Sequence, residues 1–71
     1  MNQYTKRELK EQQDELVALI AFHLEISKGE ATLWYTSPKS FLNDNTPESY
    51  IIADKYEYIR RRLDAYFEGI R

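Results

Sequence analysis

Two patterns of polar and hydrophobic residues follow one another in the first third of the chain. Residues 8–15 are charged or carry side-chain amides, except for Leu9. From Leu16 onward, hydrophobic residues recur at spacings of three and four, the period of a helix that buries one face. We therefore predict a helix over about residues 6–26, opened by a capping box from Thr5 to Glu8, whose second half alone packs on a core.

A second, shorter helix follows directly. Ser27 and Glu30 have the spacing of another capping box, which starts a helix from residue 28 to about residue 36. Pro38 ends this helix, because a proline pushes the residue before it out of helical geometry. Pro38 can itself open a single turn that reaches Leu42.

The stretch between residues 43 and 53 predicts a turn and then a third helix. Asn-Asp-Asn at residues 43–45 indicates a turn, because these residue types tolerate positive φ and bond their own backbone. Thr46 then suits a helix N-cap and Pro47 the first helical position. This helix is expected to end near Ala53.

The last helix is expected over residues 55–68. Asp54 and Glu57 have capping-box spacing, and Gly69 suits the left-handed position that ends many helices. Its hydrophobic stripe again has helical spacing and consists of Tyr56, Ile59, Leu63, Tyr66 and Phe67.

These elements predict an all-α fold: a small bundle of one long N-terminal helix, two or three short helices and a final long helix. We expect one domain over residues 1–71, with residues 1–26 as the N-terminal helix and residues 27–71 as the remainder. The expected structural core consists of Leu16, Leu19, Ile20, Trp34, Leu42, Ile51, Ile59 and Leu63.

Composition narrows the function classes. The 71 residues contain no Cys and carry a formal net charge of −2, a balance that does not favour nucleic-acid binding. Hydrophobic runs are too short for a membrane span, no targeting segment is recognisable, and we expect a cytoplasmic protein. We expect no enzyme, cofactor or metal, since the chain has no motif that pairs a nucleophile with a base.

Two polar features of the sequence are candidates for a site. His23 is the only histidine and has no partner at ligand spacing, so it is expected to pack near a helix C-terminus. Arg60, Arg61 and Arg62 point in three directions on a helix, so they are expected to form a solvated face and not a phosphate site.

The six tyrosines exceed what a small core holds, so part of this set is expected to face a protein partner.

The order of residues after position 27 resembles a known family. Ala31 and Trp34 are followed by Ser-Pro at 37–38, Phe-Leu at 41–42, a turn, Thr-Pro at 46–47 and a last helix ending at a glycine. This order is similar to the toxin-binding domain of Xre/MbcA/ParS-like antitoxins. Asp-Asn at 44–45 stands where the family has Gly-Gly. The 26 residues before the match are too few for the family's helix-turn-helix domain, so DNA binding is not expected.

The resemblance implies a partner and a site. Such domains bind a toxin with an NAD-degrading fold, and the antitoxin's C-terminal segment covers the toxin's active site. Carried over to this sequence, the partner-binding residues would be Tyr66, Phe67, Gly69, Ile70 and Arg71.

A different class of function is also open. The alternative is a phage or plasmid accessory protein that inhibits or recruits another host protein as a homodimer. The polar half of the first helix would then pair with its own copy or with a partner helix, although it would equally be free to fray.

Overall fold

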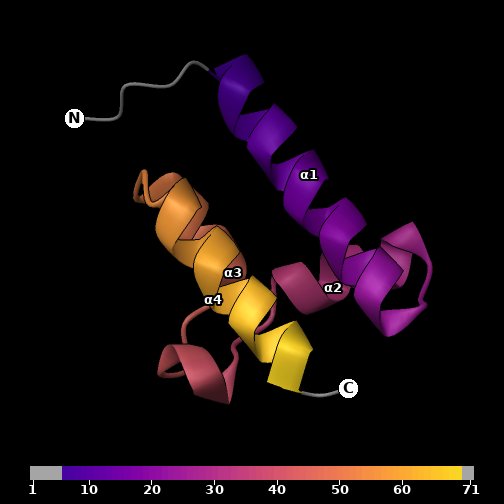
Figure 1. Cartoon of the computed structure of the whole chain (residues 1–71). Coiled ribbons are helices and arrows are strands. Elements are labelled where there is room, and N and C mark those ends of the chain that lie inside the picture. Colours follow the sequence, from indigo (N-terminus) through magenta and orange to yellow (C-terminus); the bar gives the residue numbers. More distant parts are fainter. Residues whose placement is uncertain (1–5, 70–71) are drawn as a thin grey trace.

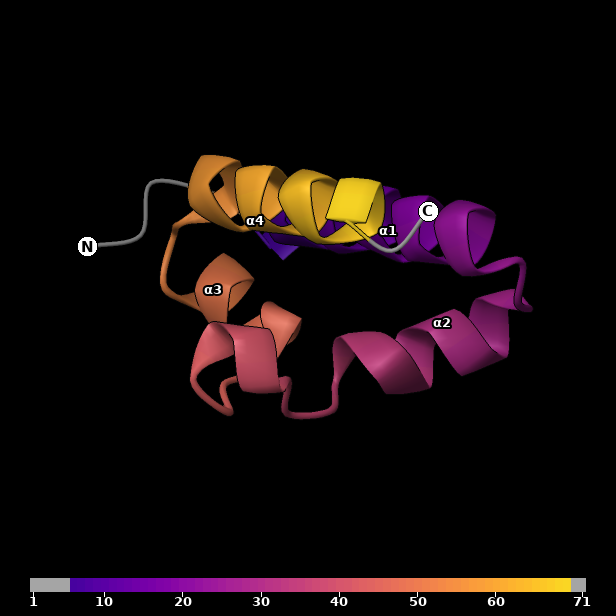
Figure 2. The same cartoon turned by 60° about the horizontal axis from the view of Figure 1, so that its bottom comes forward.

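Two layers of helices make up the fold. The computed structural model describes residues 6–69. Helices α1 (Lys6–Leu24) and α4 (Tyr56–Gly69) lie side by side and run in the same direction (Figure 1). Helix α2 (Lys28–Tyr35), the short 3-10 helix η1 (Ser40–Leu42) and α3 (Pro47–Ile52) form the second layer beneath them (Figure 2). The predicted all-α class is confirmed.

The core lies between the layers and draws on every helix. Six of the residues expected there are buried: Leu16, Ile20, Leu42, Ile51, Ile59 and Leu63. Leu19 and Trp34 are only partly buried and pack against this core. The sequence interpretation did not place Val17, Ala31, Tyr35 and Phe67 in the core, where each is 2% exposed or less.

Local polar bonds start the short helices as predicted. The Glu30 amide donates to the Ser27 hydroxyl oxygen at 3.1 Å, and that hydroxyl donates to the Glu30 carboxylate at 3.2 Å. The Ser49 amide donates to the Thr46 side chain at 3.1 Å, which caps α3. The box expected from Thr5 to Glu8 begins outside the described residues.

The end of α1 and the start of α4 differ from the prediction, in both cases because a residue takes a left-handed conformation. Helix α1 ends at Leu24, because Glu25 turns left-handed with φ 56° and the Ile26 amide donates back to the Ala21 carbonyl at 3.2 Å. Asp54 likewise has φ 64°. It therefore ends α3 and does not cap α4, so that expected capping box is wrong. Both ends form the bonded left-handed turn that glycine favours, here without a glycine.

The loop that carries η1 is closed on itself. The Lys39 amide donates to the Asn45 carbonyl at 3.0 Å, and the Asp44 amide donates to the Lys39 carbonyl at 2.9 Å. Asn43 and Asp44 have φ of 56° and 64°. The predicted Asn-Asp-Asn turn is confirmed, and it fixes Phe41 on a short, rigid loop.

Candidate functional site

Aromatic rings gather where α1 and α4 both end. The contacts connect side chains from α1, α2, η1 and α4 into one aromatic array, which we define as Phe22, His23, Trp34, Phe41, Tyr66 and Phe67. Because the parallel course of α1 and α4 brings their last turns together, residues far apart in the chain meet here (Figure 1).

Phe67 is the buried centre of the aromatic array. It is 1% exposed, and its ring stacks on His23 with centroids 4.7 Å apart and planes 8° apart. Its centroid is 5.8 Å from that of Trp34. A side chain buried in this way cannot contact a partner unless the core opens. The expectation that Phe67 lies on a partner-binding surface is therefore corrected, while His23 packs in the last turn of α1 as expected.

Tyr66 and Phe41 form the partly exposed part of the array. Their rings stack with centroids 4.2 Å apart and planes 9° apart. Trp34 lies beside both, with centroids 6.0 Å from Tyr66 and 6.3 Å from Phe41. The sequence interpretation named Tyr66 and Trp34 but missed Phe41, because only the closed loop brings its ring to α4.

Two cations hold this part of the array in place. The Lys39 ammonium lies 4.0 Å from the centroid of the Trp34 ring, a cation–π contact, and burial lowers the pKa of Lys39. Arg62 donates to the Phe41 carbonyl at 2.6 Å and so ties the loop to α4. Arg62 thus has a structural role that the expected solvated face did not include.

The array continues outward through Phe22. This ring packs edge-on against His23 with centroids 5.3 Å apart, yet the residue is 77% exposed. From Phe67 to Phe22 the aromatic array therefore passes from full burial to open surface. Phe22 is therefore the ring of the array that is most open to solvent.

The remaining predicted partner-binding residues lie at the end of α4. Gly69 is the last residue of α4 and is exposed, and a Cβ added there would meet nothing within 4 Å. No glycine among the described residues has positive φ, so the expected left-handed cap at Gly69 is wrong. Ile70 and Arg71 lie outside the described residues.

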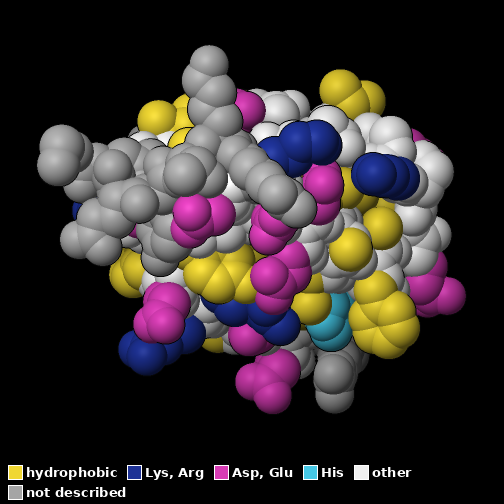
Figure 3. Space-filling model, turned by 90° about the horizontal axis from the view of Figure 1, so that it is seen from above, with side chains coloured by type: hydrophobic (Ala, Val, Ile, Leu, Met, Phe, Trp, Pro, Cys, Tyr) yellow, Lys and Arg dark blue, Asp and Glu magenta, His cyan; other side chains and the backbone are white. Residues whose placement is uncertain are grey.

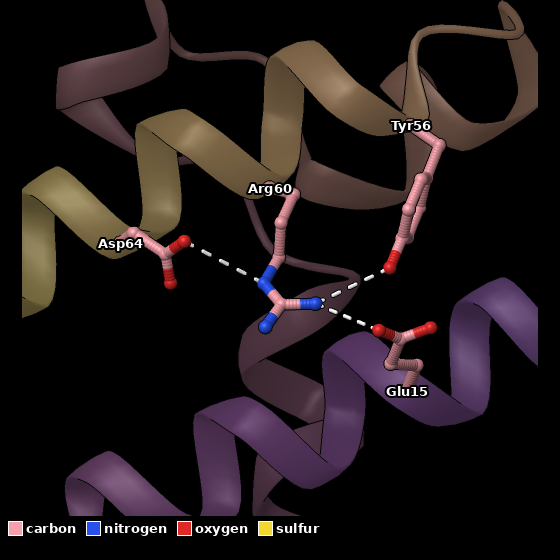
Figure 4. A network of polar contacts seen from close by, with 4 residues as sticks. All are labelled: Glu15, Tyr56, Arg60 and Asp64. Atoms are coloured by element: carbon pink, nitrogen blue, oxygen red, sulfur yellow. Dashed lines mark hydrogen bonds and ion pairs between the residues drawn. The ribbon is translucent and has the colours of Figure 1, made fainter.

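Arg60 joins the middle of α1 to the first turns of α4 through a polar network (Figure 4). It donates to Glu15 at 2.7 Å and to the Tyr56 hydroxyl at 3.3 Å, and its Nε lies 3.6 Å from Asp64. Burial first, and then the neighbouring Glu15 carboxylate, raises the pKa of Tyr56. Arg60 is therefore a tie between helices, where the sequence predicted a solvated side chain.

Charge on the outer face is mixed. Viewed from above, acidic, basic and hydrophobic side chains are interspersed over the part of the surface that is not grey (Figure 3). This distribution offers no continuous basic surface in that view. The aromatic array is the feature that stands apart from it.

Within residues 6–69, no group of three or more His, Cys, Asp or Glu side chains is placed to hold a metal ion. None of the helices there has the length and hydropathy needed to cross a membrane. Comparison with family models, with curated proteins and with solved structures finds no match to this chain.

Proposed function

We propose that this chain is a small protein-binding module similar to the toxin-binding part of an antitoxin. In this proposal it neutralises an NAD-degrading toxin by covering the toxin's active site with the end of α4 and the tail. In this role the chain binds the toxin and does not itself catalyse a reaction. The proposal extends the sequence resemblance described above.

The observation that supports it best is the stacked pair of Tyr66 and Phe41 beside the end of α4. Aromatic side chains are enriched at protein interfaces, where they provide large contact area at low entropic cost. Both rings are partly buried, Trp34 lies beside both, and Arg62 bonds to the backbone carbonyl of Phe41. These partly exposed rings support the proposal, because the resemblance implies a partner contact at Tyr66.

The first test is a pull-down of the tagged chain from its native cell, with the bound proteins identified by mass spectrometry. A stoichiometric partner that consumes NAD, and stops doing so in the complex, is the expected result. A stoichiometric partner of another kind would retain the binding role and reject the toxin assignment.

Variants locate the contact surface once the partner is in hand. Tyr66→Ala is expected to weaken binding by at least about tenfold, because interface aromatics carry much of the affinity. Deletion of residues 69–71 removes the tail and is expected to restore NAD consumption. Tyr58→Ala is the control, since Tyr58 is 52% exposed and lies outside the aromatic array. Full neutralisation of the toxin both by Tyr66→Ala and by the protein that lacks residues 69–71 would reject the proposal.

A second candidate, a homodimeric accessory protein that binds another host protein, is favoured by a different observation. Leu33 and Ile52 are 68% and 67% exposed on α2 and α3, outside the aromatic array. Burial of such side chains between two copies would stabilise a dimer. Sedimentation equilibrium of the wild type and Leu33→Glu tests it, with a dimer that Leu33→Glu dissociates as the supporting result.

A further inference from the structure

A pocket of about 310 Å³ opens between α1, α2 and α3, and it shares no residue with the aromatic array. Its apolar walls are Leu9, Ile51 and Ile52. Its polar groups come from Lys10, Gln13, Tyr35 and Glu48. The pocket therefore combines an apolar lining with a few polar groups, as small-molecule sites do.

Tyr35 is the unusual member of this lining. Its side chain is completely buried, and its hydroxyl has no hydrogen-bond partner in the structure. Leaving a buried hydroxyl unpaired costs stability, whereas phenylalanine would fill the same space without that cost. The unpaired hydroxyl lowers the stability of the fold, and its presence is explained if it forms a hydrogen bond with a ligand that enters the pocket.

The charges around the pocket determine which ligands it favours. Glu48 stands in the first turn of α3, and its charge adds to burial in raising the pKa of Tyr35 well above the ordinary value. The phenol therefore stays protonated, and its oxygen can still accept a hydrogen bond. The Lys10 ammonium lies 3.4 Å from Asp14, so these two charges offset each other. Among the described residues that line the pocket, Glu48 then supplies the remaining charge, which is negative.

We propose that this pocket binds a small aliphatic amine. The alkyl stem would lie along Leu9, Ile51 and Ile52, and the ammonium group would donate to the Tyr35 hydroxyl oxygen and the Glu48 carboxylate. A carboxylate ligand would be repelled by Glu48. An alcohol of the same length would keep the apolar contacts but lose the charge attraction.

The test uses n-hexylammonium as the probe, with n-hexanol and n-hexanoate as ligands of matched stem. Backbone amide NMR shifts of the folded chain, followed through a titration, report binding at Tyr35, Glu48 and Ile51. We expect saturable shifts with n-hexylammonium at a dissociation constant of about 1 mM, weaker binding of hexanol, and none of hexanoate. Equal affinity for the three probes, or no saturable shift with n-hexylammonium, would overturn the proposal.

Two variants assign the polar contacts. Glu48→Gln is expected to weaken n-hexylammonium binding by about tenfold, since it removes a charged hydrogen-bond partner. Glu57→Gln is its matched control, because Glu57 is likewise an acidic residue in the first turn of its helix but lies outside the pocket. Unchanged affinity in Glu48→Gln, or an equal loss in both variants, would contradict the assignment.

Tyr35→Phe separates binding from folding. The variant is expected to have an equal or higher Tm than the wild type, because the unpaired hydroxyl is gone, and at the same time to bind n-hexylammonium several-fold more weakly. A large fall in Tm would show that the hydroxyl has a partner within the protein. That result, or unchanged affinity, would reject the ligand role of Tyr35.

Discussion

The contact between α1 and α4 is polar at one end and aromatic at the other. At the first end Arg60 reaches Glu15 at 2.7 Å, and the two side chains are 36% and 53% exposed. At the second end His23 stacks on Phe67, which is 1% exposed. The two ends join the same pair of helices with different chemistry.

The two ends are expected to contribute differently, one to the alignment of α1 and α4 and the other to the stability of the fold. An exposed ion pair contributes little, because water and salt screen it, but its geometry fixes how two helices align. Buried rings contribute far more, since both area and dispersion contacts are lost when they are removed. We therefore expect the aromatic end to hold the fold together and the polar end to set its register.

The largest effect is expected from Phe67→Ala. Removal of a buried ring costs about 3–5 kcal/mol, which is comparable to the whole stability of a chain this short. Urea unfolding followed by circular dichroism is expected to show a largely unfolded protein. Phe67→Leu keeps most of the volume and is expected to cost no more than about 1.5 kcal/mol. A folded Phe67→Ala protein with near wild-type stability would contradict the comparison.

A double-mutant cycle on Phe41 and Tyr66 measures the partly exposed part of the array. Their stacked rings are expected to couple by about 1 kcal/mol beyond the effects of the single alanine variants. Tyr50 and Tyr58 provide the control cycle, since their centroids are 5.5 Å apart in a tilted pair on α3 and α4. Strict additivity for Phe41 and Tyr66 would mean that their stacking adds nothing to the fold.

The smallest effect is expected from Arg60→Met, which keeps the stem and removes the charge. The free energy of unfolding is expected to fall by less than about 1 kcal/mol, and the loss is expected to shrink at high salt. Arg61→Met is the control on the neighbouring, exposed position. A loss as large as that of Phe67→Ala would reverse the proposed division between the two ends.

Short-range signals made much of the fold predictable. The caps at Ser27 and Thr46 and the turn at residues 43–45 depend on side chains that bond backbone groups a few residues away. The residue types at these positions are therefore enough to predict the caps and the turn. The hydrophobic spacing of the long helices likewise predicts the burial of Leu16, Ile20, Ile59 and Leu63, because residues at this spacing share one face of a helix.

The candidate sites needed more than local signals. Tyr66 and Phe67 are adjacent in one aromatic stripe, and only the packing of α1 against α4 makes Phe67 core and leaves Tyr66 at the surface. Phe41 joins them through a loop closed by backbone bonds. The pocket at Tyr35 exists because three helices meet around it, which no spacing along the chain announces.

By itself the sequence determined the all-α class, the order of the helices and most of their starting points. Tertiary structure decided which aromatic residues of α4 belong to the core, since Phe67 is 1% exposed whereas its neighbour Tyr66 is only partly buried. It also decided that Arg60 and Arg62 bind across the fold where the sequence predicted a solvated face. The physical reason is range: caps and periodicity act within a few residues, whereas these features depend on contacts between segments distant along the chain.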